Sequence, residues 1–221
     1  MHEYNWDFLD HIRRSSFESI ENTQKDGSIQ GWMPQEFPTS FAKFIDFKGI
    51  DDPLVVLEVG SWKGLSANVM ACICKQKEIP TRIVCIDTWL GSPEHMEGES
   101  ASEGFKRVNG LPTIFHEFLH NTKMCKNDDI IYPFPISSTQ GAIYLERKHF
   151  AADVVYIDAG HEYDPVLMDM RYLWPILKKN GIMIMDDWKW PGVNQAVQTF
   201  FKERNDYEIT IGEEQVVIQK I

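Results

Sequence analysis

The sequence predicts an α/β fold: a doubly wound sheet of seven strands, mostly parallel, with helices on both faces. From about residue 53 onward, short and continuously apolar segments alternate with longer segments of helical character. That alternation is typical of parallel strands that helices cover on both faces. Two short segments at the end of the chain, joined by Gly212-Glu213-Glu214, predict a closing hairpin whose last strand runs antiparallel.

The expected elements follow one another along the chain. Strands are expected at 54–57, 82–86, 130–136, 154–157, 182–185, 207–211 and 215–219, because each segment is short, apolar and bounded by turn residues. Helices are expected between those strands at 65–78, 104–118, 139–148, 165–177 and 193–204. Pro80 ends the first of these helices, and Asn180-Gly181 forms the turn into the fifth strand.

Residues 1–48 differ from the rest of the chain, and we expect them to form an N-terminal helical extension or cap. Trp6, Leu9 and Ile12 lie at helical spacing, and the glycines and prolines of 27–38 interrupt the pattern. Residues 49–221 make up the main domain, with a lid-like insertion at about 88–126.

The charge balance argues against two classes of partner. Lysine and arginine total 22 against 33 acidic residues, which gives a formal net charge of −11. A chain this acidic has no general attraction for phosphate backbones or anionic lipids, so we expect neither nucleic-acid nor membrane binding. The same negative charge suits a site that holds a metal cation.

Cysteine usage and the first residues indicate a reducing compartment. The four cysteines show no paired CxxC spacing, and the chain begins with the polar and acidic residues Met1-His2-Glu3-Tyr4. That start is unlike a signal or transit peptide, and the longest apolar runs are far shorter than the ~20 residues of a membrane span. We therefore expect a cytoplasmic protein.

Four of the expected strands end in an acidic residue: Glu58, Asp87, Asp158 and Asp186. In open α/β sheets, ligands bind outside the carboxyl ends of the strands. Four carboxylates along one edge repel one another unless cations or hydroxyl donors lie between them. This edge of the sheet is therefore the predicted binding site.

A glycine-containing loop follows the first strand, with the sequence Glu58-Val59-Gly60-Ser61-Trp62-Lys63-Gly64. Its glycines let the backbone approach a ligand, and the next helix favours an anionic group at its amino end. The loop matches neither GxxxxGK[ST] nor GxGxxG, and a plain strand–helix turn remains the alternative. Asp87 is placed to accept hydrogen bonds from ribose hydroxyls, with a helix N-cap as the alternative.

These residues together resemble a known family. Glu58-x-Gly-x-x-x-Gly, Asp87, Asp158-Ala-Gly-His161-x-Tyr163 and Asp186-Asp187-Trp188 are similar to the motifs of class I S-adenosylmethionine-dependent methyltransferases, over roughly residues 50–220. More narrowly, they resemble the metal-dependent O-methyltransferases, which include catechol, macrolide-sugar and cephalosporin-biosynthetic enzymes. The resemblance implies a Rossmann-like sheet. The loop departs from the commonest motif because it lacks the central glycine.

The resemblance also implies a site for S-adenosyl-L-methionine. Glu58, Gly60, Ser61 and Gly64 belong to the loop that would hold the methionine end, and Asp87, followed by Thr88, would lie at the ribose. Ser138, Thr139 and Gln140 match the segment near the adenine, although Ser138 or Thr139 can equally cap the helix that begins there.

A divalent metal is the second implied cofactor. Asp158, Asp186 and Asp187 match the metal ligands of the family, and three oxygen ligands with water suit octahedral Mg²⁺ (or Mn²⁺); the alternative is a capped loop. His161 and Asp158 are the candidate catalytic residues. His161 lies where catechol-type enzymes place a lysine, and it either accepts the hydroxyl proton or only shapes the site.

The function implied by this resemblance is methyl transfer to a hydroxyl group of a small molecule, with a sugar ahead of a catechol as acceptor. Trp89, Trp188 and Trp190 follow strand ends, where they either form a wall of the site or pack its loops. Two alternatives stay open: a metal-independent methyltransferase, and a non-catalytic module that binds the cofactor. The glycine spacing and the final hairpin disfavour a nicotinamide-dependent oxidoreductase. Assembly into a homo-oligomer also stays open.

Overall fold

The computed structural model describes residues 4–21, 28–48, 53–96 and 105–221. Two helices precede the sheet, α1 (Asp7–Phe17) and α2 (Phe37–Lys48). The later helices are α3 (Leu65–Gln76), α5 (Ile114–Met124), α6 (Ser138–Arg147), α7 (Tyr163–Leu173) and α8 (Pro191–Phe201), together with the short 3-10 helix η1 (Pro93–Met96). No helix within these ranges is long and apolar enough to cross a membrane.

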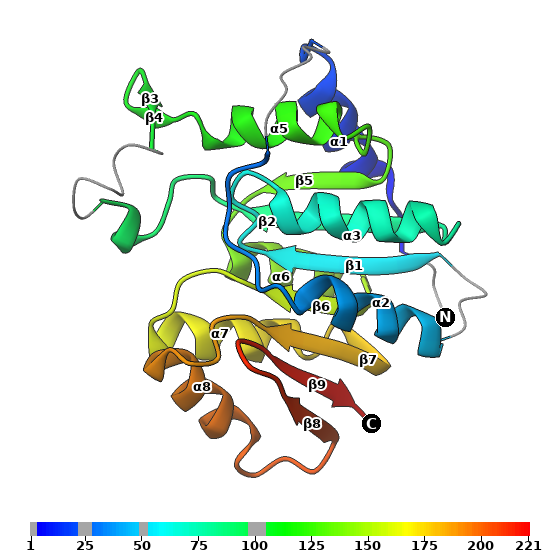
Figure 1. Cartoon of the computed structure of the whole chain (residues 1–221), viewed down its shortest axis with the longest axis vertical. Helices are drawn as coiled ribbons and strands as arrows, with labels where there is room; N and C mark the ends of the chain where they lie inside the picture. Colours follow the sequence, from blue (N-terminus) through cyan, green and yellow to red (C-terminus); the bar gives the residue numbers. More distant parts are fainter. Residues whose placement is uncertain (1–3, 22–27, 49–52, 97–104) are drawn as a thin grey trace.

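A seven-stranded sheet lies at the centre of the molecule, in the order β5-β2-β1-β6-β7-β9-β8 (Figure 1). Its strands are β1 (Leu54–Val59), β2 (Thr81–Asp87), β5 (Ile131–Pro135), β6 (Ala152–Ile157), β7 (Leu177–Met185), β8 (Tyr207–Ile211) and β9 (Val216–Lys220). Strands β5, β2, β1, β6 and β7 pair in parallel, and β9 pairs antiparallel with both β7 and β8. The expected doubly wound sheet with an antiparallel last strand is therefore confirmed.

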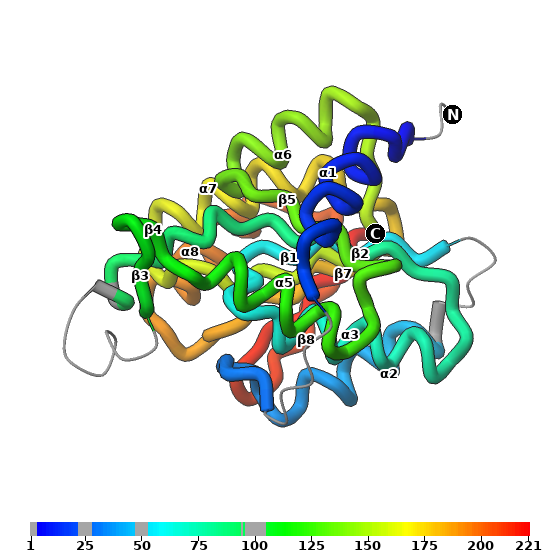
Figure 2. Tube along the Cα trace, turned by 90° about the horizontal axis from the view of Figure 1, so that it is seen from above, coloured from blue at the N-terminus to red at the C-terminus, as the bar shows by residue number. Residues whose placement is uncertain are grey.

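Side chains alternate along each strand and so divide between two cores. One core joins residues such as Leu57 and Met183 to α6, α7 and α8. The other joins residues such as Val56 and Ile184 to α2, α3 and α5. Figure 2 shows α6 and α7 on one side of the sheet and α2 and α3 on the other. Burial on both faces explains why the strands read as continuous apolar runs.

The segment after β2 differs from the expectation. The sequence predicts a helix at 104–118, but α5 begins only at Ile114, after a hairpin of β3 (Arg107–Val108) and β4 (Leu111–Pro112). Asn109 and Gly110 both have positive φ, 51° and 83°, which is the backbone of a two-residue hairpin turn. This Asn-Gly turn forms a hairpin where the first part of the helix was expected. Residue 104 itself lies outside the described residues.

The carboxyl ends of the parallel strands face one edge of the sheet. In Figure 1 the arrowheads of β1, β5 and β7 point the same way, and η1 and the β3–β4 hairpin project beyond that edge. The loops at this edge contain the candidate site residues. The fold therefore brings together on one side residues that lie more than a hundred positions apart in the sequence.

Candidate functional site

Glu58 supports the glycine loop between β1 and α3 from below. Its carboxylate is fully buried and accepts hydrogen bonds from the hydroxyls of Ser61 (2.5 Å) and Ser66 (2.6 Å). Burial raises the pKa of Glu58, although the two serine hydroxyls partly offset that effect. Glu58 therefore shapes the loop from inside the protein, at the base of the predicted cofactor site.

Two glycines allow the loop to pass close to its neighbours. Gly60 has φ +86°, and a Cβ there would lie 1.9 Å from the carbonyl oxygen of Asp158 at the end of β6. Gly64 has φ +87°, and a Cβ there would lie 2.9 Å from the Phe118 ring. At the centre of the loop, Trp62 also adopts a positive φ of 46°, without being glycine.

The Asp87 carboxylate ties the glycine loop to the end of β2. One of its oxygens accepts the N–H groups of Ser61 (3.0 Å) and Trp62 (2.9 Å), and the other accepts the N–H of Trp89 (2.7 Å). The backbone N–H of Thr88 also hydrogen-bonds this carboxylate, so its roughly four acceptor positions are all used within the protein. Burial raises the pKa of Asp87 against the opposing effect of these N–H donors. Thr88 is exposed, and its hydroxyl accepts the N–H of Leu90 (3.2 Å).

Ser138, Thr139 and Gln140 begin α6, directly after β5. The helix is capped by Ser137, whose hydroxyl accepts the N–H of Gln140 at 3.4 Å, rather than by Ser138 or Thr139. Ser138 instead hydrogen-bonds Asp169 on α7, a buried carboxyl whose pKa burial raises to about 6. Ser138 is therefore held by a neighbouring helix, whereas Gln140 is exposed.

Asp158 and Asp186 meet where β6 and β7 end side by side. Each continues the ladder by one residue: the Asp158 N–H donates to the Val59 oxygen, and the Asp186 N–H to the Ile157 oxygen, both at 2.9 Å. The Tyr156 hydroxyl lies between the two carboxylates, 3.2 Å from Asp158 Oδ2 and in closer contact with Asp186 Oδ2.

Neighbouring carboxylate charges add to the effect of burial on the pKa of Asp158 and of Asp186. Burial, and then the charges of Asp186 and Asp187, hold the pKa of Asp158 well above its ordinary value. Burial also raises the pKa of Asp186 to about 6, and the charge of Asp187 adds to that effect. A cluster of carboxylates in such surroundings has the donor chemistry that a hard divalent cation prefers. Within the described ranges, however, no three His, Cys, Asp or Glu side chains converge closely enough to hold one.

His161 lies against the acidic cluster that Asp158, Asp186 and Asp187 form. Its Nε2 is 2.8 Å from Asp187 Oδ2, and the Trp190 ring stacks on the imidazole with 4.4 Å between centroids and 23° between planes. A Cβ on Gly192 would lie only 2.2 Å from the His161 carbonyl oxygen, so α8 packs tightly against this segment. If Nε2 donates to Asp187, Nδ1 is the ring nitrogen that can accept a proton, and it is shielded from solvent.

Sequence reasoning missed Tyr156 as a member of the site. Its ring stacks on Phe37 of α2, with 4.5 Å between centroids, and its side chain is fully buried. Burial, followed by the charge of Asp158, raises the pKa of Tyr156 well above its ordinary value. The available signal was a tyrosine in the otherwise aliphatic run 154–157, two residues before Asp158.

Aromatic side chains from three segments meet beside the glycine loop. The Trp62 ring stacks on His95 of η1, with 4.3 Å between centroids, and its Nε1 donates to Gln30 at 3.0 Å. The exposed Trp32 ring lies 5.9 Å from that of Trp62. The N-terminal segment and the insertion after β2 thus both contact the loop, as a cover for the cofactor would require. Residues 97–104 of the expected lid lie outside the described residues.

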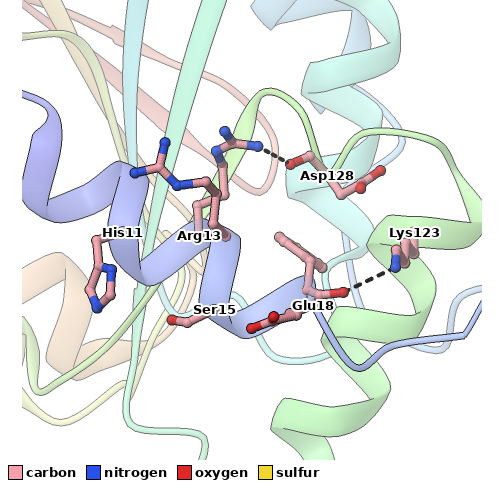
Figure 3. Close-up of a pocket in the computed structure, with 8 residues that line it drawn as sticks. His11, Arg13, Ser15, Glu18, Lys123 and Asp128 are labelled. Atoms are coloured by element: carbon pink, nitrogen blue, oxygen red, sulfur yellow. Dashed lines mark hydrogen bonds between the residues drawn. The ribbon is translucent and has the colours of Figure 1, made fainter.

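A cavity of about 500 Å³ lies elsewhere, between α1 and the segment that leads from α5 into β5 (Figure 3). Two positively charged side chains that line it hydrogen-bond backbone carbonyl oxygens. Arg13 donates to that of Asp128 at 2.9 Å, and Lys123 donates to that of Phe17 at 3.0 Å. Asp128 precedes β5, so the cavity lies toward the amino ends of the strands. It belongs to the packing of α1 and not to the edge that carries the candidate residues.

Comparison with known proteins gives a family match and a set of similar folds. A family model described as "Methyltransferase domain" matches residues 57–188. This stretch contains the glycine loop, Asp87 and the acids at the ends of β6 and β7. A curated relative, "Uncharacterized protein R132" of Acanthamoeba polyphaga mimivirus, is 25% identical over 154 residues, or 66% of this chain. The chain spans 60% of that relative's length.

Several solved structures have a similar fold. NovP, described as an O-methyltransferase, matches with a TM-score of 0.63 and 17% identity, over 96% of this chain and 98% of that one. CalS11, described as a TDP-rhamnose 3'-O-methyltransferase of calicheamicin biosynthesis, matches with a TM-score of 0.58 and 20% identity, over 83% and 78%. An O-methyltransferase from Bacillus cereus in complex with SAH matches with a TM-score of 0.60 and 11% identity, over 96% and 90%. At such identities, these similarities establish the fold.

Proposed function

The chain belongs to the methyltransferase-domain family, and on that premise we propose that it transfers a methyl group from S-adenosyl-L-methionine to a hydroxyl oxygen of a small molecule. The family match spans more than half of the chain, and the seven-stranded, mostly parallel sheet with an antiparallel last strand is the one that the sequence led us to expect. The choice of oxygen as the acceptor atom rests on the neighbours described as O-methyltransferases and on the acidic cluster.

One observation carries the cofactor proposal: two carboxylates anchor the glycine loop by hydrogen bonds. Glu58 accepts the hydroxyls of Ser61 and Ser66, and Asp87 accepts the backbone N–H groups of Ser61 and Trp62. This anchoring presents the loop at the carboxyl edge, where the methionine end of the cofactor would lie against Gly60, Ser61 and Gly64. An oxygen of Asp87 would be shared between these backbone N–H donors and a ribose hydroxyl, with Thr88 beside it. Ser138, Thr139 and Gln140 would then border the adenine.

The proposed reaction is an in-line displacement at the sulfonium methyl group. The acceptor oxygen forms the new bond to the methyl carbon, the carbon–sulfur bond breaks, and S-adenosylhomocysteine leaves as a neutral thioether. Because a neutral thioether leaves readily from a sulfonium, the protein mainly supplies alignment. The hydroxyl proton would pass to His161, which Asp187 and Trp190 hold at the acidic cluster. Asp158 would orient the acceptor hydroxyl.

Asp158, Asp186 and Asp187 are the residues that would hold Mg²⁺ or Mn²⁺. When bound, such an ion lowers the pKa of an acceptor hydroxyl and orients it. The carboxylate chemistry of the cluster supports this proposal. The alternative of a metal-independent methyltransferase is favoured by one observation, namely that no three such side chains converge within the described residues. For the acceptor we propose a sugar, because CalS11 is described as acting on TDP-rhamnose.

The decisive experiment is calorimetric titration of the full chain with S-adenosylhomocysteine and then with Mg²⁺. Wild type is compared with Asp158→Ala and Asp187→Ala. We expect the cofactor product to bind all three proteins, and Mg²⁺ to bind only the wild type. If Mg²⁺ binds none of them while the product binds, the metal-independent alternative replaces this proposal. If the product does not bind the wild type, the catalytic proposal fails.

A further inference from the structure

Helix α5 carries a constellation that the proposed function does not use. Residues 116–120 read His-Glu-Phe-Leu-His, so two histidines lie four positions apart on a helix. Residues at that spacing share one helix face, and HExxH on a helix is a known arrangement for binding zinc. Metal binding by such a pair also requires that the two imidazoles lie close together.

The two imidazoles are already close together. His116 Nε2 and His120 Nε2 lie 3.0 Å apart, and the ring centroids lie 4.5 Å apart with 78° between the planes. Two nitrogen ligands at about 2.1 Å from one ion are about 3.0 Å apart when the angle at the metal is 90°, and about 3.4 Å apart when it is tetrahedral. In this structure the 3.0 Å contact is a hydrogen bond between the two imidazoles, so a bound ion would replace the shared proton between nitrogens that already have the separation of a chelate.

We propose that His116 and His120 form a surface site for one borderline transition-metal ion of the Zn²⁺, Ni²⁺ or Cu²⁺ class, with water as the remaining ligands. His116 is exposed and His120 half-buried, so water reaches the open coordination positions. In the part of the chain that the structure describes, no third His, Cys, Asp or Glu completes a protein-only site. Imidazole favours these ions, whereas Mg²⁺ selects oxygen ligands, so this site is chemically distinct from the acidic cluster.

The glutamate of the pattern has a different role from that in a metallopeptidase. Glu117 accepts a hydrogen bond from the Thr113 hydroxyl at 2.7 Å and forms an ion pair with Lys63 at 2.9 Å. Partial burial alone would raise the pKa of Glu117, but Thr113 and Lys63 outweigh it and hold the pKa below its ordinary value. Glu117 is thus a bound carboxylate that ties α5 to the glycine loop through Lys63. We expect metal binding without peptide hydrolysis.

The test uses Ni²⁺ as the probe, on tag-free full-length protein. Calorimetric titration compares wild type with His116→Asn and His120→Asn. The matched control is His149→Asn, which removes an exposed histidine outside α5 at a positive φ (60°) that asparagine tolerates. We expect a one-to-one Ni²⁺ event in wild type and in the control, weakened at least tenfold in either α5 variant. S-adenosylhomocysteine affinity and melting temperature report whether the variants fold.

An Asp158→Ala background separates the two metal sites. There we expect the Ni²⁺ event to persist and to remain sensitive to His120→Asn. Equal Ni²⁺ affinity in wild type and both α5 variants overturns the proposal, as does loss of the event in the Asp158→Ala protein alone. Neither outcome depends on whether the chain methylates anything, so failure here is distinguishable from failure of the proposed function.

Discussion

Two acidic residues, Glu58 and Asp169, have carboxyl groups that are buried from water, and their hydrogen-bond partners differ. Glu58 is fully buried but accepts two serine hydroxyls, whereas Asp169 is buried with a hydrogen bond to Ser138. Hydrogen bonds to a carboxylate offset part of the cost of burying its charge, and more donors offset more of it. The two acids therefore make different contributions to stability.

Replacing Glu58 tests its role below the glycine loop. Glu58→Ala leaves the hydroxyls of Ser61 and Ser66 buried without their acceptor, which we expect to cost about 2–5 kcal/mol of unfolding free energy. Glu58→Gln keeps the shape and can still accept one hydroxyl, so its stability should stay within about 1 kcal/mol of wild type. Urea unfolding measures both. Equal stability of the two variants would show that the hydroxyl contacts are not needed.

Asp169 gives a pH-dependent prediction. Its pKa is raised from 3.8 to about 6, so the folded state binds its proton more tightly than the unfolded chain does. Stability therefore falls as pH rises between these two values, and above about pH 6 the ionised carboxyl costs about 3 kcal/mol. Asp169→Asn should remove this loss and stabilise the protein at neutral pH. The exposed Asp164, on the same helix, provides the control variant Asp164→Asn.

The measurement is the urea midpoint of each protein near neutral pH and near pH 5. The advantage of Asp169→Asn over wild type should shrink on acidification, because the wild-type carboxyl is then protonated in the folded state. A constant difference between the two proteins across this range would contradict the assigned cause.

Among the elements, the glycine loop makes the closest backbone approach that bears on the site. Gly60 and Gly110 have nearly equal φ, +86° and +83°, but only Gly60 faces backbone: a Cβ at Gly110 would have nothing within 4 Å. Gly110→Ala should thus cost only about 1 kcal/mol, from its conformation. Gly60→Ala should cost several kcal/mol and abolish binding of S-adenosylhomocysteine, because the loop must move away from Asp158. Thermal unfolding and calorimetry check both, and similar losses would refute the close-approach argument.

The elements also show what sequence patterns reveal. The strands were predictable because burial on both faces makes each an apolar run such as 154–157, and the acids at their ends follow from topology. The start of α5 was not predicted correctly. The Asn109-Gly110 turn forms a hairpin inside the segment that was expected to be one helix. Tyr156 was missed since its contact with Asp186 requires the pairing of β6 with β7, which local sequence does not report.

Across the whole molecule, the sheet order separates two tasks. The predicted cofactor residues lie at or after the carboxyl ends of β1, β2 and β5, and the acidic cluster follows β6 and β7. The two halves meet where Gly60 passes Asp158, which is where a transferred methyl group would have to cross from cofactor to acceptor. The proposed function therefore requires Gly60 and Asp158 to stay side by side, and the parallel pairing of β2, β1, β6 and β7 holds them there. The register shift between β6 and β7 lies at Ala152–Val154, away from this junction.

Repulsion within the acidic cluster should make the metal-free protein less stable than a variant with one fewer negative charge there. The charges of Asp186 and Asp187 raise the pKa of Asp158, and the charge of Asp187 raises the pKa of Asp186. No bound cation offsets this repulsion in the metal-free protein. Asp158→Asn keeps an oxygen near the Tyr156 hydroxyl while removing one charge. We expect this variant to unfold at a higher temperature than wild type in the presence of a chelator, and to lose methyl transfer.

Added Mg²⁺ provides the control for that experiment. It should stabilise wild type by an amount that grows with its concentration, because a ligand that binds only the folded state shifts the equilibrium by mass action. Asp158→Asn should show little response. If the site lowers the stability of the protein in order to bind a cation, Asp158→Asn should be more stable than metal-free wild type but less active. If Asp158→Asn is instead less stable than wild type without metal, the carboxylate is a structural partner of Tyr156 and the acids do not form a strained cation site.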